Sequence, residues 1–133
     1  MIGRTAVLAA LALALPAVAQ DRVPAPRYFV ETAMETSTAQ VLAVNCPTLS
    51  IDPVAMARRS EVALKRLTDD GFTPENLMER MEDPSAEIAV LQDAFVAKHG
   101  LSDGADQNTV CAAGKAEIAE GSAIGALLLE VEG

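Results

Sequence analysis

The sequence predicts an all-α protein, a compact bundle of four to five helices stapled by one disulfide. A capping residue followed by proline occurs three times, at Asp52-Pro53, Thr73-Pro74 and Asp83-Pro84. Each pair is typical of a helix start, because the cap binds free amides and proline fits the first turn. No segment alternates apolar and polar residues as a half-buried strand does. Cys46 and Cys111 are the only two cysteines, so one disulfide is the most that the chain can form.

Residues 1–19 have the composition of a secretory signal peptide. Arg4 supplies a positive charge, the apolar run 6–15 follows, and Ala17-Val18-Ala19 supplies small residues for the peptidase. We expect cleavage between Ala19 and Gln20. The apolar run is shorter than the ~20 residues that span a bilayer. The signal predicts export to the periplasm or secretion, with no membrane segment after cleavage.

Residues 20–133 are predicted to form one helical domain, which begins with an irregular, proline-containing arm over 20–26. The first helix is expected from Arg27 to about Val44, where Pro47 and the residues before it end it. The second is expected to begin at Asp52-Pro53 and to end at Gly71, the C′ residue. Its predicted buried face comprises Met56, Ser60, Ala63, Leu64 and Leu67.

Two further helices follow the remaining cap-and-proline pairs. A short one is expected from Thr73-Pro74 to about Glu82, and another from Asp83-Pro84 to the Lys98-His99-Gly100 sequence. In the second of these, Ile88, Leu91 and Phe95 share one face. After a polar loop over 101–107, the last helix is expected from about Asn108 to Leu129.

Four residues of that last segment follow one another at helical spacing: Gly114, Ile118, Gly121 and Gly125. A glycine inside a helix costs about 1 kcal/mol relative to alanine, so close approach of another backbone should offset the cost. We interpret this face as packing against a neighbouring helix of the same chain. The alternative is the face of a homodimer or of a protein partner.

A disulfide between Cys46 and Cys111 would join the end of the first helix to the start of the last, so the two helices should run antiparallel. Redox-active pairs are usually close in sequence, whereas these cysteines lie 65 positions apart, which favours a structural bond. Closing such a loop is expected to stabilise the fold by about 4 kcal/mol.

The mature chain is strongly acidic. Nine basic residues stand against nineteen acidic ones after position 19, a net charge of −10. Such a charge repels phosphate backbones and anionic lipids, so neither nucleic acid nor a membrane is an expected partner. A basic protein partner is compatible with it.

Two motifs resemble a known family. They are Asn45-Cys46-Pro47 and the pattern Cys111-x-x-Gly114-x-x-Glu117-Ile118 with Ser122, Ile124, Gly125, Leu127 and Leu128 beyond it. Over about residues 40–129 the chain is similar to domain of unknown function 5333, a family of small exported alphaproteobacterial proteins. The resemblance implies a helical domain with the Cys46–Cys111 pair, and it implies no activity.

The sequence contains no recognisable set of catalytic residues. His99 is the single histidine, and no G-x-S-x-G context surrounds a serine. We interpret His99 as a cation near a helix C-terminus. Met78 and Met81 place two thioethers on one helical face, as in some exported copper proteins, although such pairs are more often core residues.

We therefore expect a non-enzymatic binding or interaction protein, accessory or inhibitor-like, without cofactor or metal. A protein partner or a homodimer is possible. One alternative is a periplasmic chaperone-like or stress-protective homo-oligomer. Another is a small metal carrier or an enzyme that uses carboxylates or the Met78/Met81 pair.

Overall fold

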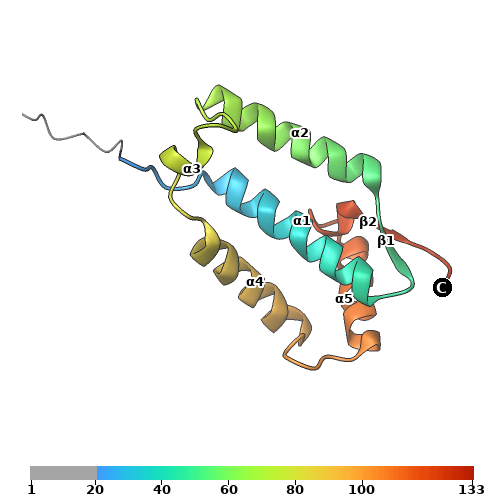
Figure 1. Cartoon of the computed structure of the whole chain (residues 1–133). Helices are drawn as coiled ribbons and strands as arrows, with labels where there is room; N and C mark the ends of the chain where they lie inside the picture. Colours follow the sequence, from blue (N-terminus) through green and yellow to red (C-terminus); the bar gives the residue numbers. More distant parts are fainter. Residues whose placement is uncertain (1–20) are drawn as a thin grey trace, which may run out of the picture.

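The computed structural model describes residues 21–133; the predicted signal peptide and the Ala19–Gln20 cleavage site lie outside the described residues. The described part confirms the all-α class, with five α-helices, one 3₁₀ helix and two short strands (Figure 1). In chain order the elements are α1 Arg27–Asn45, β1 Leu49–Ile51, α2 Pro53–Asp69, α3 Leu77–Arg80, α4 Ser85–His99, α5 Gln107–Glu120, η1 Gly125–Leu127 and β2 Leu128–Glu130. None of these helices is both long and apolar enough to cross a bilayer.

Helix α1 lies at the centre of the structure (Figure 1). Helix α2 runs antiparallel along one side of α1, whereas α4 runs along the other side in the same direction as α1. Helix α5 packs against α1 and η1. The main core includes Leu42 of α1, Phe95 of α4, Ala113 of α5 and Leu127 of η1. A second, smaller core forms around Leu67, Phe72 and Met81.

The predicted helix starts of α2 and α4 are confirmed. Asp52 Oδ1 accepts hydrogen bonds from the amides of Val54 and Ala55, at 3.0 and 3.1 Å. Asp83 Oδ1 accepts the amide of Ser85 at 3.0 Å. The predicted ends of these two helices are confirmed as well. Gly71 follows α2 and Gly100 follows α4, and both have positive φ angles, 85° and 64°.

The predicted buried face of α2 is wrong at two positions, and one of them is Ser60, which is exposed. Leu64 is 60% exposed, whereas Ala63 and Leu67 are buried. Arg59, which the helical pattern places off that face, instead forms an ion pair with Glu35 of α1. The long arginine side chain reaches inward because Glu35 is buried and needs a partner.

The third predicted helix is shorter than expected. It covers only Leu77–Arg80, because Thr73 and Asn76 bond to each other's amides and form a turn before it. The arm before α1 is irregular, as predicted, and it is held in place at α3. The Val23 amide donates to the Arg80 carbonyl, and the Glu82 amide donates to the Val23 carbonyl, each at 2.8 Å.

The prediction that the last helix extends to Leu129 is wrong. Helix α5 ends at Glu120, because Gly121 adopts a left-handed conformation with φ of 65°. The chain then forms η1 and β2. Strand β2 pairs antiparallel with β1, with Leu49 opposite Glu130 and Ile51 opposite Leu128. The expectation of no strand is therefore wrong too, since three-residue strands carry no detectable alternation.

The predicted pairing of Cys46 and Cys111 is confirmed. Their Cα atoms lie 5.2 Å apart, and the bond joins the residue after α1 to the first half of α5. Helix α5 then runs back against the direction of α1 (Figure 1), as the sequence predicts. The disulfide thus fixes the end of α1 that lies next to the small β-sheet.

Candidate binding grooves

The predicted glycine face does not form one helical stripe. A Cβ added at Gly114 would overlap the Leu49 side chain of β1, and one added at Gly125 would overlap the Glu117 carbonyl. Ile118 packs on the main core, whereas Gly121 is exposed with open space around it. Two of the glycines therefore permit close packing inside the chain, against a strand and the end of α5 rather than against a neighbouring helix.

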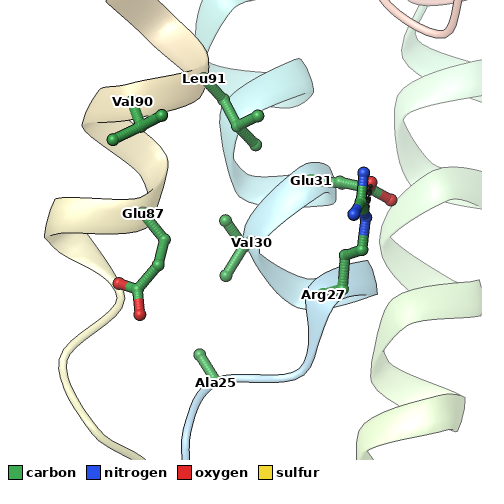
Figure 2. Close-up of a pocket in the computed structure, with 7 residues that line it drawn as sticks. All are labelled: Ala25, Arg27, Val30, Glu31, Glu87, Val90 and Leu91. Atoms are coloured by element: carbon green, nitrogen blue, oxygen red, sulfur yellow. Dashed lines mark hydrogen bonds and ion pairs between the residues drawn. The ribbon is translucent and has the colours of Figure 1, made fainter.

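Two grooves lie between α1 and α4. The first, which we call the N-terminal groove, lies where both helices begin and has a volume of 360 Å³. Its apolar lining consists of Ala25, Val30, Val90 and Leu91. Figure 2 shows Val30 of α1 between the two helices, with Leu91 of α4 above it and Ala25 below. Val90 is 67% exposed at the rim, so this apolar surface faces solvent.

The charges of the N-terminal groove are unbalanced. Arg27 Nε donates to Glu31 Oε1 at 2.6 Å, so these two α1 residues neutralise each other. Glu87 of α4 lies on the opposite side (Figure 2) and forms no ion pair with a residue between 21 and 133. The Glu87 carboxylate can therefore interact with a ligand or with solvent.

The C-terminal groove, with a volume of 400 Å³, lies where α1 and α4 end. Its apolar lining includes Val41, Leu42, Phe95, Val96, Leu101 and Val110. Val41 is 60% exposed, which leaves much of this valine side chain in water. Two side-chain amides also line the groove: Gln92 donates to the Ser37 hydroxyl at 3.3 Å, and Asn45 donates to the Val41 carbonyl at 2.8 Å. Their oxygen atoms can accept hydrogen bonds from a bound group.

His99 lies in the last turn of α4, and its side chain is 9% exposed. Its ring centroid is 4.6 Å from that of Phe95, and its Nε2 is 3.3 Å from Glu117 Oε2. Lys98 Nζ donates to Glu117 at 2.9 Å and to Glu120 at 2.7 Å. Burial favours the neutral form of Glu117, but the hydrogen bond and charge of Lys98, helped by His99, hold its pKa below the ordinary value. The cluster ties α4 to α5.

A second buried carboxylate behaves in the opposite way. Burial raises the pKa of Glu35 above its ordinary value, although the Arg59 guanidinium opposes that shift. Arg59 Nε is itself buried without a hydrogen-bond partner in the described chain. The sequence does not reveal either buried glutamate, because only the packing of α1 on α2 and of α4 on α5 shows which carboxylates are enclosed.

Metal-binding geometry is not evident among residues 21–133, where no three histidine, cysteine, aspartate or glutamate side chains gather around one point. Met78 and Met81 both line a groove beside α3. Met78 is 83% exposed, whereas Met81 is 5% exposed and packs in the smaller core. The alternative of a metal carrier that uses this pair is not tested by the structure.

These features define a small, disulfide-linked helical protein with two grooves on one pair of parallel helices. The chain belongs to DUF5333, a family of unknown function, whose profile matches residues 21–129. This match confirms the resemblance found in the two cysteine-containing motifs. The comparisons with curated proteins and with solved structures gave no match.

Proposed function

We propose that this chain is an exported, non-enzymatic binding protein, of the accessory or inhibitor kind, that docks a protein partner on its α1–α4 face. The observation that carries the proposal is that both grooves between α1 and α4 have apolar linings that reach solvent. Val90 is exposed at the N-terminal groove, and Val41 and Val96 are exposed at the C-terminal groove. Clustered exposed apolar side chains favour interaction sites.

The dimensions of the grooves suit side chains of a partner. Volumes of 360 and 400 Å³ lie at the lower end of the range for ligand sites. Each groove can take one or a few apolar side chains, the anchors that carry most of the energy in protein interfaces. The amides of Asn45 and Gln92 supply hydrogen bonds that orient such a segment at the C-terminal groove.

Export is supported by the disulfide and by the predicted signal at residues 1–19. Disulfides persist in oxidising compartments such as the periplasm and are rare in the cytosol. The bond between Cys46 and Cys111 closes a loop over most of the fold. The partner is therefore expected among exported or envelope proteins.

Quantitative capture tests this function. Tagged mature protein is cross-linked in periplasmic extract, the product is identified by mass spectrometry, and the purified partner is titrated against variants. We expect Val41→Asp to weaken binding at least tenfold, because an aspartate at the groove must be desolvated. Leu64→Asp is the matched control, since Leu64 is also 60% exposed but lies on α2.

Three results would contradict the proposal. They are the absence of a stoichiometric partner, equal weakening by the two variants, and a purified partner that turns out to be a substrate converted by the chain. Self-cross-linking that Val41→Asp abolishes would keep the α1–α4 face as the binding surface and make the partner a second copy of the chain.

A further inference from the structure

Another groove lies between α2 and the segment that contains η1, away from the α1–α4 face. It has a volume of 390 Å³. We call it the arginine groove, because the two charged residues of its lining are Arg58 and Arg59. The other lining residues are apolar: Ala55, Val62, Ala123, Ala126 and Leu127. In Figure 1 the red segment that contains η1 lies beside α2.

The charge of the arginine groove is positive. Arg58 is exposed and forms no ion pair with a residue between 21 and 133. Arg59 is partly neutralised by the buried Glu35 of α1, which does not line the groove. Glu61 follows on α2, but it lies outside the lining and forms no ion pair within the same range. The lining therefore presents the uncompensated charge of Arg58 and no carboxylate.

This local charge opposes that of the whole chain. Helix α2 contains four basic and two acidic residues, a net charge of +2, whereas residues 20–133 together carry −10. A long polyanion such as nucleic acid would place most of its phosphates over acidic surface and be repelled. A ligand with one or a few carboxylates can place them at the arginines alone. The charges of the groove thus select a short acidic group.

The apolar part of the lining is open to solvent. Val62 is 52% exposed, and Ala123 and Ala126 are exposed as well. Leu127 is buried beneath them, with 3% of its surface exposed. Sites for small molecules enclose most of the surface of the ligand. An open apolar surface suits side chains that project from the backbone of a protein partner instead.

We propose that the arginine groove docks an acidic segment of a protein partner. A carboxylate of that segment would pair with Arg58, and neighbouring apolar side chains would cover Val62 and the exposed alanines. A guanidinium can bind a carboxylate through two parallel hydrogen bonds, which fixes the position of the segment. Burial of the Val62 side chain adds affinity. The groove is formed by α2 and η1, so this proposal does not rest on the function proposed for the α1–α4 face.

A labelled peptide of leucine and glutamate is the probe, and fluorescence anisotropy measures its binding to the mature chain. At physiological ionic strength, where repulsion beyond about 8 Å is largely screened, we expect saturable binding. Arg58→Gln should weaken it about fivefold, because the carboxylate loses its partner. Arg58→Lys, which keeps the charge, should retain more of the affinity than Arg58→Gln. Val62→Gln should weaken binding by about fivefold as well.

Two control variants change similar residues outside the groove. Lys115→Gln removes an exposed cation of α5 that forms no ion pair in the described part of the chain. Leu64→Gln changes an apolar side chain of α2 that is 60% exposed. Both should leave the affinity within about twofold. General attraction between opposite charges does not explain binding, since the peptide and the chain are both acidic.

Three results would overturn the proposal. The first is no saturable binding of the leucine–glutamate peptide. The second is an equal loss of affinity in the control variants and the groove variants. The third is self-association that Arg58→Gln abolishes while the peptide does not bind, because the occupant would then be a second copy of the chain. Val41→Asp leaves this groove unchanged, so the α1–α4 face is tested independently.

Discussion

Glu117 and Glu35 show how neighbouring side chains decide the charge of a buried carboxylate. Both are nearly enclosed, and burial favours the protonated form of each. At Glu117 the Lys98 ammonium lies 2.9 Å away, and it outweighs burial. At Glu35 the single Arg59 does not, so the pKa of Glu35 is raised. The two residues therefore make pH-dependent contributions of opposite sign to folding stability.

The stability that comes from Glu117 should disappear in acid. Because its folded pKa is lower than its unfolded pKa, the contribution is present above the unfolded value and is lost as pH falls through the folded value. We expect Glu117→Gln to lower the free energy of unfolding by about 2 kcal/mol near neutral pH, and by less below about pH 4. Urea denaturation across this range measures the difference.

Glu120→Gln is the control for that experiment, because Glu120 bonds to the same lysine but is half-exposed. An exposed pair should contribute well under about 1 kcal/mol. A loss in Glu117→Gln that stays constant with pH would contradict the assignment of Glu117 as an ionised, lysine-bound group.

The glycines of the C-terminal region should differ in their tolerance of a side chain. Gly125→Ala places a methyl group against the Glu117 backbone, so we expect a loss of about 3 kcal/mol. Gly121→Ala meets no atom within 4 Å and loses only the left-handed preference of glycine, about 1 kcal/mol. Thermal unfolding with calorimetry compares them; equal losses would argue against the close contact at Gly125.

Among the elements, those fixed by local chemistry could be predicted from the sequence. Asp52 caps α2, Asp83 accepts the amide of the first residue of α4, and Gly71 ends α2 through its own backbone angle. The pairing of β1 with β2 could not, because three-residue strands are recognisable only when their distant partner lies beside them. The glycine spacing after Glu120 indicated a helix, yet Gly121 in the left-handed conformation ends it.

The grooves could not be predicted from the sequence, for a related reason. Val41 and Val96 look like ordinary core positions until α1 and α4 are seen to lie side by side. Leu64 was expected inside and lies outside, since α2 turns Arg59 rather than Leu64 toward α1. Helical periodicity identifies an apolar face but does not identify which neighbour covers it.

The disulfide should contribute strongly to the stability of the packed helices. Cys46 and Cys111 connect the end of α1 to α5 across 65 positions, and opening this bond frees a long loop in the unfolded chain. We expect reduction to lower the free energy of unfolding by about 4 kcal/mol. Guanidinium denaturation with and without reductant measures it. The Cys46→Ser/Cys111→Ser variant should be insensitive to reductant, and an unchanged midpoint in the wild-type chain would contradict the prediction.

At the scale of the whole molecule, exposed apolar side chains and charged side chains occur together along the α1–α4 face. The grooves between α1 and α4 present exposed valine side chains beside four charged residues, Arg27, Glu31, Glu87 and Asp93. With a net charge of −10 after the predicted signal, we expect the chain to repel nucleic acid and anionic lipid. A protein surface is the partner that we propose for the α1–α4 face.

The most direct test of this account is site-specific photo-cross-linking in cells that produce the chain from its whole sequence, residues 1–133. A photoreactive residue replaces Val41 in one variant and Leu64 in another, two positions with the same exposure on different helices. The account predicts a discrete adduct with one partner protein, or with a second copy of the chain, from position 41 and none from position 64. Adducts of equal yield from both positions, or an adduct from position 64 alone, would contradict binding at the α1–α4 face.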